Sequence, residues 1–375
     1  MFRSLIAAVA FSVAVSAQTA VQNPPAQTPP QGQRAGGAGR GGQQTPEAIK
    51  AARDREVEQQ KQTDALWQKA SAGFMKMEKI TYKSSEGGMT IPAFVFTPLK
   101  PRGPKGHAAL VWVHPDIRGH VYEYYYPYVR EAVSRGYVVI APEYRGSYGY
   151  GQEHYDAIDY GGKEVEDVIS SVDYLKTMSI VDPERIGIIG WSHGGMITLL
   201  SIERAPKTFK AAAALVPVTN LFQRLAWNGV EQRKQQIDPW NRTGGLPNEQ
   251  KAEYKRRSPI YQIDNVEIPL LVHITRNDQD VVYEEAAQLV DALRARKPMT
   301  TETKIYENPV GGHLFDRMCP ATLPGAGRGA GAGTAPPARP DPASLDSYIP
   351  TNTPEQRDSW NRVWTFLDWN LQPYR

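Results

Sequence analysis

Short apolar segments alternate along this chain with amphipathic helical patterns, and few folds can accommodate that alternation. Several segments are continuous runs of Val, Ile, Leu and Ala, which is typical of strands covered on both faces. The pattern predicts an α/β architecture, with a mostly parallel central sheet and helices on both faces. Strands are predicted at residues 80–82, 91–97, 108–114, 137–143, 185–190, 211–216, 269–274 and 303–307. Helices are predicted at residues 124–134, 163–178, 193–204, 284–296 and 354–370.

The N-terminal segment has a different composition from the rest of the chain. Arg3, an apolar run over residues 5–15 and small residues before Gln18 predict a signal peptide over residues 1–17 and a secreted or periplasmic protein. The apolar run is too short to span a bilayer. Residues 18–46 are rich in Pro, Gly and Gln, so we expect a disordered tether there.

The remaining chain is expected to form one domain with an extension before it. Residues 47–78 predict a charged helical extension on the surface, with the helix ending near Lys69. Residues 79–375 form the predicted catalytic domain, which contains a cap insertion over residues 219–262. A Pro/Gly-rich stretch over residues 320–344 is expected to be a disordered loop.

Charge and cysteine content exclude several classes of function. The net charge of +3 is accounted for by Arg3, Arg34 and Arg40, so the body is neutral and offers no basic surface for nucleic acid. Cys319 is the only cysteine, which excludes an intrachain disulfide and a cysteine-based metal site. No metal or dinucleotide motif is present, so we expect no cofactor.

A nucleophile is predicted where one buried strand meets the next helix. Gly190-Trp191-Ser192-His193-Gly194 matches Gly-x-Ser-x-Gly in the strand–turn–helix context of a nucleophile elbow. The glycines let strand and helix approach closely around a strained serine. The hydroxyl of Ser192 is then presented at a helix N-terminus, which favours developing negative charge.

A serine nucleophile needs a base and an orienting acid, which follow it in the order acid, then histidine. Only His273 and His313 follow the elbow helix, and His273 lies in an apolar run, so His313 is the predicted base. Asp278 and Asp280 both follow the strand that contains His273. We favour Asp278 as the acid and expect Asp280 to be a helix N-cap.

An oxyanion hole and an acyl pocket are predicted around the serine. The backbone N–H of His193 is one expected donor. The second donor is left open among the His114 ring, the Asp116 N–H and a tyrosine from residues 122–126, because Pro115 has no N–H. Arg145 is interpreted as holding a loop, with substrate contact as the alternative. The predicted pocket residues are Trp191, Phe222, Trp227 and Val281.

Five segments carry a resemblance to a known family: residues 142–151, 181–187, 190–195, 257–260 and 311–313. Together they resemble the catalytic domain of the prolyl oligopeptidase family of serine peptidases, over roughly residues 79–375. The resemblance implies an α/β-hydrolase fold, a Ser192–Asp278–His313 triad and hydrolysis of peptide or related acyl bonds. We expect the family's N-terminal β-propeller to be absent, so dipeptide-releasing specificity is not carried over.

These observations predict an exported serine hydrolase that cleaves peptide or aminoacyl bonds through an acyl-enzyme. The alternatives are a carboxylesterase or feruloyl-type esterase with the same triad, and a non-catalytic binding protein with the same fold. The expected partner is a peptide or ester substrate, and the oligomeric state stays open.

Overall fold

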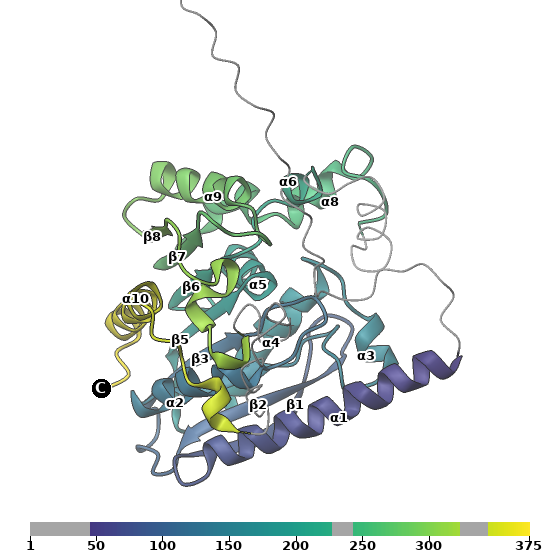
Figure 1. Cartoon of the computed structure of the whole chain (residues 1–375). Coiled ribbons are helices and arrows are strands. Elements are labelled where there is room, and N and C mark those ends of the chain that lie inside the picture. Colours follow the sequence, from purple (N-terminus) through teal and green to yellow (C-terminus); the bar gives the residue numbers. More distant parts are fainter. Residues whose placement is uncertain (1–45, 227–242, 323–343) are drawn as a thin grey trace, which may run out of the picture. The chain divides into compact units, whose positions relative to one another are not determined.

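An eight-stranded sheet forms the centre of the computed structural model, which describes residues 46–226, 243–322 and 344–375 (Figure 1). The strand order is β1-β2-β4-β3-β5-β6-β7-β8. The first two strands add antiparallel pairs at one edge, and all pairs from β4 to β8 are parallel. Each predicted strand is present: β1 (Met75–Lys83), β2 (Thr90–Pro98), β3 (His107–Val113), β4 (Val138–Pro142), β5 (Val181–Trp191), β6 (Ala211–Leu215), β7 (Leu270–Thr275) and β8 (Thr301–Tyr306).

Helices cover both faces of the sheet and form two separate hydrophobic clusters with it. One face packs against α4 (Lys163–Thr177), α5 (His193–Arg204) and α9 (Tyr283–Arg296). The other face packs against α1 (Pro46–Ser71), α2 (Tyr126–Ser134) and α10 (Pro354–Leu371). Short helices that the sequence analysis did not predict are α3 (Gln152–Asp156), α6 (Leu221–Ala226) and α8 (Lys251–Arg256).

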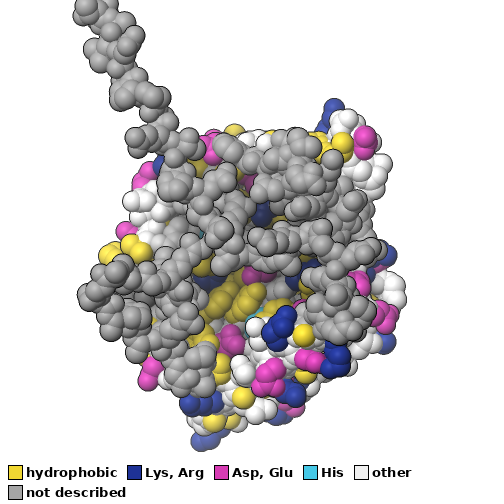
Figure 2. Space-filling view, turned by 45° about the vertical axis from the view of Figure 1, so that its right-hand side comes forward, with side chains coloured by type: hydrophobic (Ala, Val, Ile, Leu, Met, Phe, Trp, Pro, Cys, Tyr) yellow, Lys and Arg dark blue, Asp and Glu magenta, His cyan; other side chains and the backbone are white. Residues whose placement is uncertain are grey.

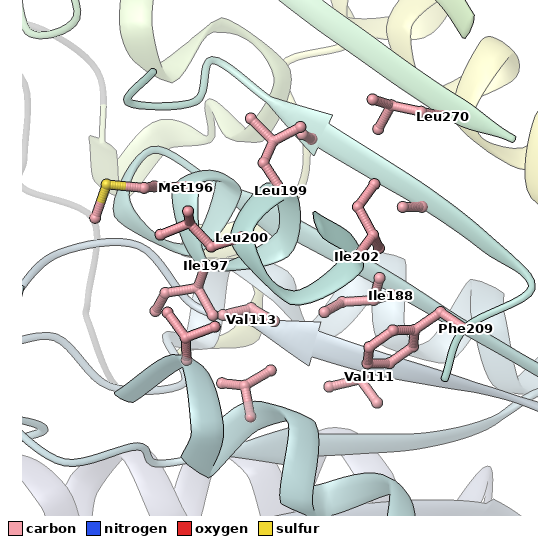
Figure 3. Close-up of a cluster of buried hydrophobic side chains, with 14 of the residues drawn as sticks. Val111, Val113, Ile188, Met196, Ile197, Leu199, Leu200, Ile202, Phe209 and Leu270 are labelled. Carbon is pink, nitrogen blue, oxygen red and sulfur yellow. The ribbon is translucent and has the colours of Figure 1, made fainter. Parts of the chain in front are cut away.

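Helix α5 is buried along almost its whole length, which fits the apolar residues Met196, Ile197, Leu199, Leu200 and Ile202 that alternate there with small polar ones. Figure 3 shows its side chains, Leu199 and Leu200 among them, gathered with Val111 and Val113 of β3 and Ile188 of β5. Each such buried side chain contributes on the order of 1.5–3 kcal/mol to the free energy of folding. The helix that follows the predicted nucleophile is therefore firmly held.

The N-terminal extension predicted over residues 47–78 contains a helix, as expected, but its last four residues already belong to β1, and the last turns of the helix are not on the surface. Trp67 is buried against Phe96 of β2, with ring centroids 4.9 Å apart, and its indole N–H donates to the carbonyl of Val121. The predicted signal peptide, nearly all of the tether and most of the 320–344 loop lie outside the described residues. Within the described ranges, no helix is both long enough and apolar enough to cross a membrane.

A buried carboxyl group just after β4 makes the stability of this fold depend on pH. Glu143 accepts a hydrogen bond from the Val121 N–H, and its other oxygen lies 3.8 Å from Nε2 of His114. Burial raises the pKa of Glu143 to about 8. Its contribution to stability is thus fully present below the ordinary pKa range of glutamate and is lost as the pH rises through about 8.

Glu143→Gln should weaken this pH dependence, because glutamine stays neutral and keeps an oxygen for the Val121 N–H. We expect the free energy of unfolding, measured in urea, to fall less between about pH 5 and about pH 9 than in the wild type. Glu184→Gln, at an exposed position, is the control and should follow the wild type. An equal fall in both variants would contradict the assignment.

Candidate active site

Ser192 connects the end of β5 to the start of α5 in a strained backbone conformation. Its φ of 53° and ψ of −117° are rare for a residue other than glycine. Hydrogen bonds to neighbouring segments hold the backbone in this conformation. The Ser192 N–H donates to the Leu215 carbonyl at 3.0 Å, and the Ser192 carbonyl accepts from the Val218 N–H at 3.2 Å. Only 8% of the residue is exposed.

The glycines around Ser192 are required by close backbone contacts. A Cβ on Gly190 would lie 2.3 Å from the carbonyl oxygen of Gly194, and a Cβ on Gly194 would lie 2.4 Å from that of His114. A Cβ on Gly195 would lie 2.9 Å from Pro217. These contacts give the Gly-x-Ser-x-Gly pattern the steric basis that the sequence analysis attributed to it.

Asp278 and His313 form a hydrogen-bonded pair. Nδ1 of His313 and Oδ2 of Asp278 are 2.7 Å apart, which fixes the proton on Nδ1 and leaves Nε2 free to act as a base. The other Asp278 oxygen accepts the N–H groups of Asp280 and Val281 at 2.8 and 2.9 Å. Asp280 itself is not an N-cap, because Val282 occupies that position of α9.

The sheet brings the three predicted triad residues to one edge. Ser192, Asp278 and His313 follow β5, β7 and β8, respectively, and these strands belong to the consecutive parallel strands β5-β6-β7-β8. His313 is on a 3₁₀ helix, η4 (Gly312–Arg317), where the sequence predicted a loop. In the described part of the chain, no hydrogen bond joins the Ser192 hydroxyl to His313; such bonds are often long before substrate binds.

The predicted pocket residues lie in different environments. Trp191 has no exposed surface, and its indole Nε1 donates to Oδ2 of Asp316 at 2.7 Å. Val281 is also buried, so both residues lie in the core and not on a cleft wall, contrary to expectation. Phe222 is half-buried on α6, and Trp227 lies outside the described residues.

The predicted oxyanion donors are only partly available. The backbone N–H of His193 is in the first turn of α5, where helix donors lack intrahelical partners. The His114 ring is buried and engaged on both sides, by the Pro115 carbonyl at 2.8 Å and the Ser147 hydroxyl at 3.0 Å. Burial lowers its pKa to about 3, so the ring is neutral. His114 therefore has no ring N–H to offer a substrate.

Asp116 and the nearby tyrosines supply the remaining candidates. Asp116 is exposed and has a φ of 71°, and its carbonyl accepts from the Tyr144 hydroxyl at 2.9 Å. The hydroxyls of Tyr122 and Tyr126 donate to Asp116 and Leu345, respectively. Tyr125 is fully buried, whereas Tyr124 is half-buried. The Asp116 N–H and the Tyr124 hydroxyl are thus the second donors that fit.

Several buried polar pairs around the site were not predicted. Nε2 of His193 lies 3.2 Å from Glu164, which anchors the residue after Ser192 to α4. Arg145 is paired with Asp167 at 2.6 Å and is buried, which fits the loop-holding interpretation. Sequence pattern alone did not indicate these pairs.

Comparison with known proteins agrees with this geometry. The sequence profile of the prolyl oligopeptidase family, peptidase family S9, matches residues 125–317, just over half of the chain. The chain belongs to the prolyl oligopeptidase family. The match runs from the tyrosine-rich segment before α2 to the end of η4, so it includes all three predicted triad residues.

Individual members of the prolyl oligopeptidase family resemble this chain over part of their length. An uncharacterized peptidase, YuxL, from Bacillus subtilis is 30% identical over 64% of this chain and 36% of its own. Acylamino-acid-releasing enzyme 1 from rice (Oryza sativa subsp. japonica) is 31% identical over 49% of this chain and 24% of its own. The chain thus spans about a quarter to a third of the length of these relatives.

Solved structures share the fold. A puromycin-hydrolyzing peptidase from Mycobacterium tuberculosis has a TM-score of 0.59 and 22% identity, covering 78% of this chain and 39% of its own. An acylaminoacyl peptidase in complex with a chloromethyl ketone has a TM-score of 0.56 and 22% identity, covering 64% and 38%. Both likenesses support the α/β-hydrolase fold.

Gly194→Ala should destabilise the protein, because the new methyl group would meet the His114 carbonyl. We expect a loss of about 1–3 kcal/mol in the free energy of unfolding, as for other overpacked sites. Alanine is the better helix former, so helix propensity would act in the opposite direction. Gly103→Ala is the control, since no atom lies within 4 Å of its Cβ position. Equal stability of the two variants would contradict the steric argument.

Proposed function

We propose that this chain is a serine peptidase that cleaves peptide or aminoacyl bonds, with Ser192 as nucleophile, His313 as base and Asp278 as orienting acid. The observation that carries the proposal is the 2.7 Å bond between His313 and Asp278, at the same sheet edge as a strained serine. Structural roles would not require a buried carboxylate, an imidazole and a strained hydroxyl-bearing residue to converge.

The proposed reaction proceeds in two steps. The Ser192 oxygen attacks the substrate carbonyl carbon while Nε2 of His313 accepts the hydroxyl proton. His313 then gives this proton to the leaving amine, the C–N bond breaks and an acyl-enzyme remains. Water, deprotonated by His313, hydrolyses the acyl-enzyme and restores the hydroxyl. Asp278 stabilises the protonated imidazole in both steps.

An apolar acyl group is the class that Phe222, a predicted pocket residue on α6, would favour. Its ring packs against Tyr254 and Tyr261, with ring centroids 5.5 and 5.8 Å away. Figure 2 shows one face of the molecule, on which hydrophobic side chains lie next to a histidine. The named activity of the rice relative, release of acylamino acids, makes acylated peptides the first class to test. An esterase with the same triad remains the second candidate, because the site would also accept an ester.

We also propose that the protein is exported. The support is the order of Arg3, the apolar run over residues 5–15 and the small residues before Gln18, which is the order of a secretory signal.

Ser192→Ala should abolish both covalent labelling and turnover. A fluorophosphonate probe should label the full-length wild type and leave the variant unlabelled, and kcat should fall on the order of 10⁶-fold. Ser134→Ala, at an exposed serine on α2, is the control and should behave as the wild type. Equal labelling of wild type and Ser192→Ala would show that the nucleophile is elsewhere.

A matched pair of substrates separates the two candidate reactions. An N-acylaminoacyl anilide and the corresponding ester should both be hydrolysed by a peptidase, and both activities should be lost in Ser192→Ala. Ester turnover with amide turnover at background would identify the esterase instead.

Tyr124→Phe should reduce kcat about 100-fold if the phenol is the second oxyanion donor, with a small effect on KM. Burial raises the pKa of Tyr124, so the hydroxyl keeps its proton and can donate. Tyr126→Phe is the control, because that hydroxyl already donates to the Leu345 carbonyl, and its kcat should stay within about threefold of wild type. An unchanged kcat in Tyr124→Phe would assign the role to the Asp116 N–H.

A further inference from the structure

The 3₁₀ helix that carries His313 also carries a buried acidic residue on the same side. Helix η4 (Gly312–Arg317) has His313 and Asp316 three positions apart. With three residues per turn, side chains at i and i+3 of a 3₁₀ helix lie one above the other. Asp316 has no exposed surface, so its carboxylate faces the protein interior.

The Asp316 side chain is bonded to the residue that precedes the nucleophile. Oδ2 accepts the indole N–H of Trp191 at 2.7 Å, and Trp191 is the last residue of β5. The ring of Trp191 is packed against Trp112 and Trp360, with centroids 4.9 and 5.8 Å away. The indole of Trp191, the residue before Ser192, is therefore held in one position by the rings around it.

The backbone of Asp316 is anchored separately from its side chain. Its carbonyl accepts from the Trp360 indole at 2.6 Å, the Tyr128 hydroxyl at 3.1 Å and the Gln356 amide at 3.3 Å. These donors come from α10 and α2. Asp316 thus joins η4 to β5 through its side chain and to two helices through its carbonyl.

We propose that Asp316 is a positioning residue, which holds the His313 imidazole at the right distance from Ser192 through its hydrogen bond to Trp191. This inference rests on the proposed function, since it assigns a role within the same reaction. Nothing else in the described part of the chain bonds a side chain of η4 directly to β5.

The cost of burying this carboxylate argues against a packing role. Desolvation raises the pKa of Asp316, opposed by the neighbouring Arg317, the Trp191 hydrogen bond and His313. In the ion pair with Arg317, Nη1 of the arginine lies 3.2 Å from Oδ1 of Asp316. Nε of Arg317 has no acceptor among the described residues. Apolar side chains of similar size would fill the space at a lower cost.

The charge of Asp316 also acts on His313. His313 favours the ionised form of Asp316, which fits their positions one above the other on η4. The other charged or titratable groups near this pair are Asp278, which is hydrogen-bonded to His313, and Arg317, Tyr125 and Tyr128, which surround Asp316.

Two conservative variants test the proposal in the full-length protein. Trp191→Phe removes the indole N–H and keeps an aromatic ring, and we expect kcat to fall about 10–100-fold while KM stays within about threefold. Asp316→Asn keeps an oxygen for the indole and removes the charge. Because the Trp191 indole can still donate to that oxygen, we expect kcat to stay within about threefold of the wild type. Thermal unfolding should show that both variants are folded.

A matched control and a clear failure criterion complete the experiment. Tyr137→Phe removes a buried donor to the Asp368 carboxylate, far from the site in sequence, and should leave kcat unchanged. A wild-type kcat in folded Trp191→Phe, or a kcat in Asp316→Asn as low as in Trp191→Phe, would overturn the proposal. If Ser192→Ala kept full activity, the proposed function would fail instead, so the two failures are distinguishable.

Discussion

The close approach of β5 and α5 is the constraint on which the rest of the site depends. Glycine at 190 and 194 removes the side chains that would separate strand from helix, and the helix N-terminus then lies directly above the strand end. The same approach brings the His114 carbonyl against Gly194, so the loop after β3 is fixed relative to the serine as well. One steric requirement thus sets the backbone of Ser192, the direction of the first helical N–H groups and the position of the loop that would form one side of the proposed oxyanion hole.

Parallel strand order then gathers groups that are distant in sequence. Asp278 and His313 are separated by 35 positions, yet they meet because β7 and β8 are neighbours and both end at the same edge. Asp278 performs two tasks with its two oxygens: one holds the imidazole, and the other accepts the N–H groups of its own loop. Asp278 is therefore held on both sides before any substrate binds, which would lower the reorganisation needed in the proposed reaction.

The sequence predicted the sheet well because its strands are nearly uniform apolar runs. It also selected Asp278 and His313, which the structure pairs, because chain order restricts the choice to few residues; their roles as acid and base stay a prediction. It misplaced Trp191 for an identifiable reason. Alternate residues of a strand face opposite sides, and Ile188 of β5 lies in the cluster with α5 whereas Ile189 and Trp191 lie in the cluster with α10. Adjacency to Ser192 suggested a cleft residue, but the two-residue period of the strand places its ring in the core. The partner of its indole, Asp316, is 125 positions away and carries no local pattern.

A histidine on a short 3₁₀ helix needs more support than the strand before it can give. Such helices have few internal hydrogen bonds, so their orientation is set by what they pack against. Here the carbonyl of Asp316 takes three donors from α2 and α10, and its carboxylate takes one from β5. The C-terminal helix α10 thereby becomes part of the support for the base, although none of its side chains belongs to the proposed triad. Its two donors to Asp316, Gln356 and Trp360, are one turn apart on the same buried face of α10. One face of α10 therefore holds η4 through two hydrogen bonds. In this way residues outside the proposed triad can fix the position of His313.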